Sequence, residues 1–221
     1  MNVVLRDRED VRAAGALVAR ALGQSPDIVL RLRETRSPTG EPRLQLGAWL
    51  PYDVLVMRSI ELRSPAQGTD RADLAVFGRD LLDGLERVGS DGVLDLARMP
   101  PAWWSGTWPS APCWRPREVV AAEVVHGLAR EAARALKGTE PAGRSATQQA
   151  GALMLDQTVL TATDSGGDVR VPLRLLLASS RMGFLGSHPA RVATATGWIR
   201  LDATYGSSVV RDGADLSLRP V

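Results

Sequence analysis

The chain has 221 residues with 27 basic and 25 acidic side chains, and its only cysteine is Cys113. One cysteine excludes an intramolecular disulfide and an all-cysteine zinc site, and no run of about 20 apolar residues offers a membrane span. The hydrophobic fraction of 44% and charged fraction of 24% are those of an average globular protein. We therefore predict a cytoplasmic protein with an ordinary packed core, no cofactor and no membrane span.

The first ninety residues predict a helix, three strands and a second helix. Apolar residues recur at helical spacing from Asp10 to Leu22. Residues 28–35, 44–50 and 54–62 alternate apolar and polar side chains, and their short links favour an antiparallel meander. The second helix would be capped by Asp70 and run to about Val88. Its expected buried stripe consists of Leu74, Phe77, Leu81, Leu85 and Val88.

A Trp- and Pro-rich segment, residues 99–117, separates this half from a third helix. We expect that helix to run to about Leu136 with Pro116 in its first turn, where proline is favoured. Beyond a polar stretch at 138–150, the pattern favours strands. The expected strands are 153–163, 169–177, 192–202 and 207–211, with a hairpin loop at 164–168. Residues 173–180 fit a short helix equally well, because a brief apolar run does not fix its period.

These elements predict an α+β fold with two halves. A helix–three-stranded antiparallel meander–helix half is joined by a Trp/Pro-rich loop and a helix to a mainly antiparallel β half. The corresponding divisions are an α-β-β-β-α subdomain at 1–98, a connector at 99–137, a flexible link at 138–150 and a β-rich subdomain at 151–221.

The order of elements in residues 10–88 resembles two small modules, the double-stranded-RNA-binding domain and the α/β adaptor fold of secretion chaperones. RNA-binding domains of that kind place a basic cluster at the start of the second helix. The corresponding residues here are Asp70-Arg71-Ala72-Asp73, whose carboxylates would repel phosphate. The resemblance to an RNA-binding domain therefore fails at this position, whereas the resemblance to an adaptor is not contradicted.

Tryptophans gather in the central segment and form the first candidate site. Aromatic side chains beside arginines on an irregular loop can anchor a protein partner or stack bases; they can also simply pin a long connection to the core. Because Glu118 follows directly and no acid-free basic run adjoins the cluster, a protein partner is the favoured ligand. The candidate partner-binding residues are Trp103, Trp104, Trp108, Trp114, Arg115 and Arg117.

An uneven distribution of charge marks the second candidate. Residues 169–201 carry five arginines and no acid, whereas residues 70–95 carry seven acids and three arginines. Several arginines converging on one surface would bind phosphate, although the basic segment could also pair with the acidic one inside the fold. The candidate anion-binding residues are Arg170, Arg174, Arg181, Arg191 and Arg200.

Catalytic and metal-binding patterns are weak. Glu123 and His126 lie one helical turn apart, but carboxylate-bridged dimetal sites need two such pairs and further carboxylates. The sequence has no G-x-S-x-G or P-loop motif. We therefore predict no catalytic residue and no metal site, and favour a non-catalytic binding or adaptor protein with a protein partner or a second copy of itself. A nucleic-acid or polyanion binder is the alternative, and an enzyme whose site the sequence does not reveal is the second alternative.

Overall fold

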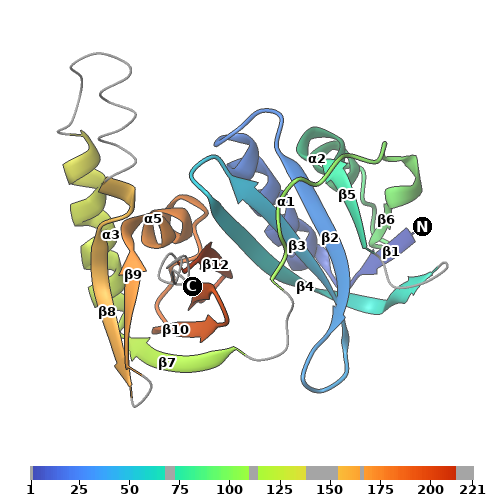
Figure 1. Cartoon of the computed structure of the whole chain (residues 1–221). Helices are drawn as coiled ribbons and strands as arrows, with labels where there is room; N and C mark the ends of the chain where they lie inside the picture. Colours follow the sequence, from blue (N-terminus) through green and yellow to red (C-terminus); the bar gives the residue numbers. More distant parts are fainter. Residues whose placement is uncertain (1, 68–72, 110–113, 138–153, 165–166, 213–221) are drawn as a thin grey trace, which may run out of the picture. The chain divides into compact units, whose positions relative to one another are not determined.

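A computed structural model describes residues 2–67, 73–109, 114–137, 154–164 and 167–212 (Figure 1). The chain divides into two compact units. Unit 1 comprises Met1–Pro51 and Leu55–Thr107, and unit 2 comprises Tyr52–Val54 and Trp108–Val221. Each unit combines helices with antiparallel strands. The predicted mixed α and β class is thus confirmed, whereas the helix–meander–helix layout is not.

Unit 1 is built around an antiparallel sheet in the order β5-β2-β3-β4, with β1 pairing both β4 and β6. Its elements in chain order are β1 (Asn2–Leu5), α1 (Arg8–Leu22), β2 (Val29–Arg36), β3 (Pro42–Leu50), β4 (Val54–Gln67), β5 (Asp73–Phe77), α2 (Gly78–Glu86), β6 (Val93–Asp95) and the 3₁₀ turn η1 (Leu96–Arg98).

The core of unit 1 follows from strand alternation. Leu30 pairs with Ala48 and Leu32 with Leu46 across β2 and β3, and all four side chains are buried. Side chains directly opposite each other in an antiparallel pair share a face. α1 and α2 pack together and bury their apolar stripes in this unit. The intervening residues of β2 and β3 therefore form the opposite, outer face of the sheet.

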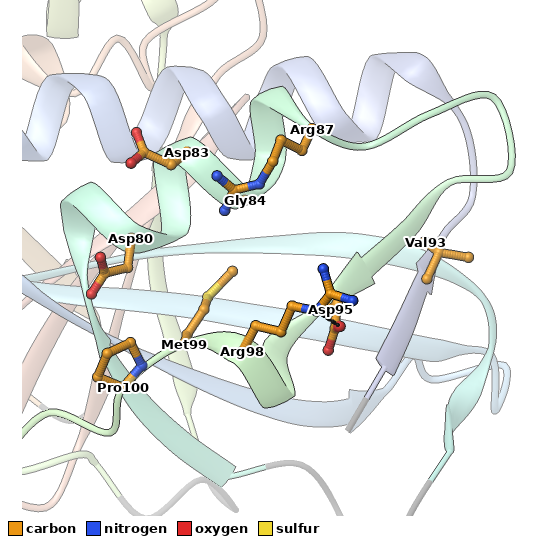
Figure 2. A pocket seen from close by; sticks show the side chains of 9 residues that line it. All are labelled: Asp80, Asp83, Gly84, Arg87, Val93, Asp95, Arg98, Met99 and Pro100. Atoms are coloured by element: carbon orange, nitrogen blue, oxygen red, sulfur yellow. Dashed lines mark ion pairs between the residues drawn. The ribbon is translucent and has the colours of Figure 1, made fainter.

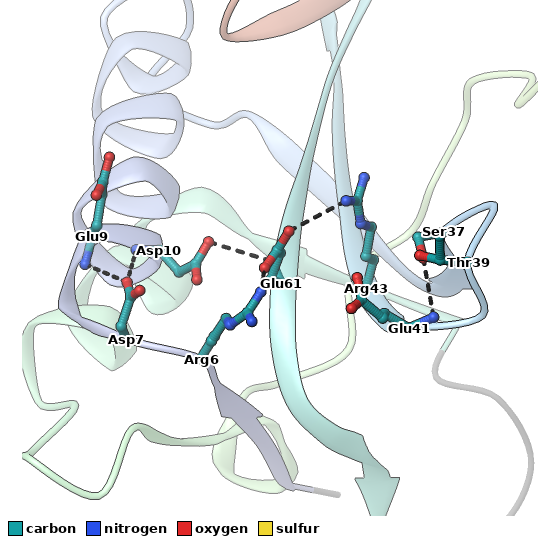
Figure 3. Close-up of polar contacts among 9 residues, drawn as sticks. All are labelled: Arg6, Asp7, Glu9, Asp10, Ser37, Thr39, Glu41, Arg43 and Glu61. Carbon is teal, nitrogen blue, oxygen red and sulfur yellow. Dashed lines mark hydrogen bonds and ion pairs between the residues drawn. The ribbon is translucent and has the colours of Figure 1, made fainter.

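The start of α1 is tied to the neighbouring strands by charged side chains (Figure 3). The Asp7 carboxylate caps the helix by accepting hydrogen bonds from the backbone N–H groups of Glu9 and Asp10, at 2.8 and 3.0 Å. Glu61 on β4 forms ion pairs with both Arg6 and Arg43, and its backbone N–H donates to the Asp10 carboxylate at 3.3 Å. The helix terminus is thereby fixed to the sheet.

Unit 2 has a four-stranded antiparallel array in the order β12-β11-β10-β7 and a separate β8–β9 hairpin. Its elements are β7 (Arg115–Val120), α3 (Ala122–Lys137), β8 (Thr158–Asp164), β9 (Gly167–Pro172), α5 (Leu173–Arg181), β10 (Ala190–Ala195), β11 (Trp198–Ala203) and β12 (Gly206–Arg211).

Helix α5 is largely buried and packs against β11 and β12. Leu173 and Leu177 on its other side meet Ala132 of α3 in a small apolar cluster. Ser179 and Ser208, both fully buried, share a hydrogen bond of 2.8 Å that joins α5 to β12. This bond satisfies two hydroxyls that would otherwise be buried without partners.

The predicted second helix is wrong over its first part. Residues Asp73–Phe77 form β5, and the helix runs only from Gly78 to Glu86. The apolar run that includes Leu74 and Val76 fits a strand as well as a helix, and pairing with β2 satisfies the backbone groups along the edge of that strand. Phe77, which we expected in the buried stripe, is 43% exposed.

Two further predictions for the C-terminal half are wrong, and two are confirmed. Pro116 lies in the edge strand β7 rather than in a helix; edge strands tolerate proline because one side of their backbone is unpaired. Residues 192–202 form two strands, since Gly197 turns the chain with a φ of 71°. Residues 173–181 form α5, which confirms the helical alternative for that run. The predicted hairpin of β8 and β9 is confirmed.

Some predicted features fall on residues outside the described ranges, namely Asp70, Cys113 and the link at 138–150. Within the described part of the chain, every helix is too short or too polar to cross a bilayer.

Candidate protein-interaction surface

The segment after η1 runs along the edge of the unit 1 sheet. Pro101 forms an antiparallel bridge with Val76 of β5, and the Ala102 N–H donates to the Ala75 carbonyl at 2.8 Å. Exposed edge strands carry unpaired backbone groups that invite further pairing. The start of the Trp segment therefore covers part of the β5 edge.

A tryptophan that sequence reasoning did not select holds the next part of this segment. Trp49 lies on the outer face of β3, and the backbone at Gly106 packs directly against its indole ring. A Cβ atom built on Gly106 would lie 1.8 Å from two atoms of that ring. Only glycine allows such an approach, so the loop is fixed to the sheet by a backbone-to-indole contact.

Two consecutive tryptophans of this fixed segment differ in exposure. Trp104 is partly buried and its indole nitrogen lies out of contact with solvent. Trp103 is 86% exposed, the highest value for any large hydrophobic side chain in the described residues. Tryptophan is enriched among the side chains that anchor protein–protein contacts. Phe77, at the end of β5, is a second exposed aromatic side chain of this unit.

The remaining aromatic and basic candidates of the segment belong to unit 2. Trp108 is partly buried and Arg115 is exposed. Trp114 lies beneath the Arg200 guanidinium, 4.6 Å from its ring centroid, and Arg117 donates to the Thr194 hydroxyl at 2.8 Å. The six predicted partner-binding residues are thus distributed over both units.

The five predicted anion-binding arginines stand on four different elements of unit 2. Arg174 forms an ion pair with Asp156, and Arg200 forms one with Asp202 at 2.6 Å. Arg181 lies over the ring of Tyr52, at 5.5 Å from its centroid, and burial raises the pKa of that phenol. Arg170 and Arg191 are exposed on β9 and β10. Two of the five are therefore already neutralised by carboxylates of the same unit.

In the described ranges, no three His, Cys, Asp or Glu side chains form a group able to hold a metal ion. His126 is partly buried, and its Nε2 lies 3.1 Å from the Gly186 carbonyl oxygen, while Glu123 is exposed. His126 therefore contacts the protein's own backbone at Gly186.

Comparisons with known proteins show two family matches and a similarity of fold. Residues 1–106 match a family described as a domain of unknown function (DUF8010), and residues 109–215 match a second one (DUF8185). The DNA polymerase III subunit beta of Pseudomonas aeruginosa superposes with a TM-score of 0.58 at 15% identity, over 96% of this chain and 65% of that one. The fold is similar to that of sliding clamps. No curated protein matches the chain.

Two further clamps show the same likeness. The Caulobacter crescentus pol III beta gives a TM-score of 0.57 at 13% identity, over 96% of this chain and 65% of that one. The Helicobacter pylori beta clamp bound to a DNA ligase peptide gives 0.57 at 13% identity, over 100% of this chain and 69% of that one. The chain therefore spans about two thirds of the length of these clamps.

Proposed function

We propose that this chain is a non-catalytic scaffold of clamp-like fold that binds protein partners. The observation that carries the proposal is the likeness to sliding clamps over 96–100% of the chain. One of these clamps is described as bound to a peptide of DNA ligase.

Trp103 is the partner contact that we propose first. It projects from a segment whose backbone is held by Val76, Ala75 and Trp49, so little freedom is lost when a partner covers it. Trp104, Trp108, Trp114, Arg115 and Arg117 are retained as candidate contacts around it or on unit 2. A cytoplasmic location, with a protein partner or a second copy of the chain, remains part of the proposal.

A peptide selection tests this function. Short random peptides displayed on phage are selected on the immobilised full chain, and enriched peptides are resynthesised for affinity measurement. We expect Trp103→Ala to weaken at least one enriched class by about tenfold or more, as buried aromatic anchors do. Tyr205→Ala is the control, because Tyr205 is an exposed aromatic side chain of the other unit. Failure to enrich any binding peptide would count against the scaffold.

A nucleic-acid-binding role is the second candidate, because the similar structures are described as DNA polymerase clamps. Arg170, Arg181 and Arg191 are exposed and could contact phosphate. Binding of that kind weakens steeply with salt, since each phosphate contact releases a counterion. A double-stranded DNA fragment titrated at two ionic strengths distinguishes the candidates: no binding at low salt removes the nucleic-acid role and leaves the protein scaffold.

A further inference from the structure

Unit 1 contains a groove that the fold likeness does not explain. It has a volume of about 350 Å³ and lies between α2 on one side and β6 with η1 on the other (Figure 2). Acidic and basic side chains, a methionine and a proline line it. The lining side chains used below are Asp80, Asp83, Arg87, Asp95, Arg98 and Met99.

The charges in the groove are not balanced. Asp80 and Asp83 lie three residues apart on α2 and so face the same side of the helix; both line the groove. Neither carboxylate has an ion-pair or hydrogen-bond partner within the described residues. In contrast, Arg98 and Asp95 pair with each other at 3.0 Å. The groove is therefore lined by two carboxylates that have no partner among the described residues.

An apolar floor lies beside these carboxylates. Met99 extends toward α2 and packs against Gly84, where a Cβ atom would lie 2.3 Å from the methionine methyl group. Pro100 continues the floor close to Asp80 (Figure 2). Lysine and arginine side chains bury their aliphatic stems on apolar surface while the charged end remains in a polar environment. A floor of this kind under two free carboxylates matches such a side chain.

We propose that this groove binds a protein segment carrying a lysine or arginine, whose charged end contacts Asp80 and Asp83 and whose stem lies on Met99 and Pro100. Arg87, one helical turn after Asp83 on α2 and likewise without a charged partner among the described residues, offers a contact for an acidic residue of the same segment. The inference rests on the proposed scaffold function and assigns it a second contact, chemically distinct from Trp103.

Charge complementarity selects this occupant over others. Phosphate or another anion would meet the two free carboxylates, and like charges at such distances repel. A bare metal ion would lack ligands, because the acidic side chains of the groove do not gather into a metal-binding group. A cation on a flexible apolar stem can pair with the carboxylates through its charge and pack on Met99 and Pro100 through its stem.

The test uses the full chain and the peptides selected as above. Enriched peptides are predicted to contain lysine or arginine, and replacing that residue by norleucine or citrulline should weaken binding by about fivefold, the effect of losing an exposed ion pair or two. The double variant Asp80→Asn/Asp83→Asn should weaken binding of the unchanged peptide by a similar factor. When the altered peptide is measured on the double variant, the total loss of affinity should be smaller than the product of the two separate factors. Thermal unfolding confirms that the variant is folded.

A matched pair of variants on the same helix controls for general charge. Asp83→Asn should weaken the peptides, whereas Glu86→Gln should not, because Glu86 is exposed on α2 but does not line the groove. Equal loss in both variants would overturn the proposal by showing unspecific attraction to an acidic helix.

The remaining outcomes separate the groove from the scaffold. If peptides bind but respond only to Trp103→Ala, the groove proposal fails while the proposed function stands; if no peptide binds, both fail. Sedimentation of the wild type and of Asp80→Asn/Asp83→Asn tests the remaining occupant. Self-association that the double variant abolishes would assign the groove to a second copy of the chain and overturn the peptide assignment.

Discussion

The two units use tryptophan in opposite ways. In unit 1, the chain backbone at Gly106 covers Trp49 and the adjacent segment leaves Trp103 86% exposed. In unit 2, arginines from neighbouring strands lie over the rings: Arg200 covers Trp114 at 4.6 Å and Arg211 covers Trp198 at 5.5 Å. These cation–π contacts engage Trp114 and Trp198 within the fold. Trp103 of unit 1, in contrast, leaves most of its indole surface exposed.

The largest effect should come from breaking the contact that fixes the unit 1 segment. In Gly106→Ala the new methyl group would overlap the Trp49 ring, so the loop or the ring must move. Overpacking of this kind costs about 1–3 kcal/mol of the free energy of unfolding, measurable by urea denaturation. The same shift should increase acrylamide quenching of the tryptophan fluorescence. An unchanged unfolding midpoint would show that the loop is not held by Trp49.

Removing the arginine that covers Trp114 tests the other half of the comparison. Arg200→Met keeps an apolar stem but loses both the stack and the ion pair with Asp202. We expect a loss of about 1 kcal/mol, the sum of a partly desolvated cation–π contact and a weak ion pair. A double-mutant cycle with Trp114→Ala isolates the stack. A coupling energy of zero would mean that Trp114 is held by other contacts.

Replacing one glycine in each unit by alanine should raise the free energy of unfolding rather than lower it. Gly127 on α3 and Gly15 on α1 are interior helix positions where a Cβ atom would meet nothing within 4 Å. Alanine at either position should raise the free energy of unfolding by about 0.5–1 kcal/mol, because glycine is a poor helix former. Gly92→Ala is the contrasting variant: its φ is 75° and its Cβ would lie 2.7 Å from the Leu5 carbonyl oxygen, so it should destabilise.

Trp103→Ala should have little effect on folding. Exposed positions away from special contacts usually change stability by less than about 0.5 kcal/mol. The same substitution should remove the part of the fluorescence that iodide quenches most readily, since Trp103 is the most exposed indole of the described residues. A decrease of several kcal/mol in the free energy of unfolding would show that the Trp103 indole stabilises the fold, and would contradict its assignment as a partner contact.

Sequence patterns predicted those elements whose periodicity is unambiguous. The alternation of residues 28–35 and 44–50 located β2 and β3, and the helical spacing before Leu22 located α1. The apolar run at Leu74–Phe77 fits two periods, and only pairing with β2 decides between them. Pro116 became a strand residue because β7 lies at an edge, which no local pattern reveals.

The candidate sites show a similar limit. The cluster of tryptophans in the sequence identified Trp103 as a candidate, but no pattern predicted that its side chain is exposed. The sequence did not identify Trp49 and Gly106, because they are 57 positions apart and come into contact only in the fold. The excess of acids in residues 70–95 was visible, but the sequence could not show that Asp80 and Asp83 line a groove while Asp73 and Asp95 are paired with arginines.

The smallest expected effect concerns Asp10 at the fixed start of α1. Burial, together with the Asp7 carboxylate, raises the pKa of Asp10 above its usual value of 3.8, although Arg6 opposes the shift. Between 3.8 and the raised pKa the folded chain binds more protons than the unfolded chain, so this group makes the protein less stable as the pH rises through that window. Above the window the full penalty of the ionised carboxylate remains.

Asp10→Asn tests this sign. The variant keeps an oxygen that can accept the hydrogen bond from the Glu61 N–H but carries no charge to desolvate. We expect it to be slightly more stable than the wild type at pH 7 and equal to it well below pH 3.8, where the carboxyl of the wild type is protonated in both the folded and the unfolded state. Urea denaturation at several pH values measures the difference. A variant that is less stable at pH 7 would show that the charge of Asp10, through Arg6 and the helix N-terminus, outweighs its burial.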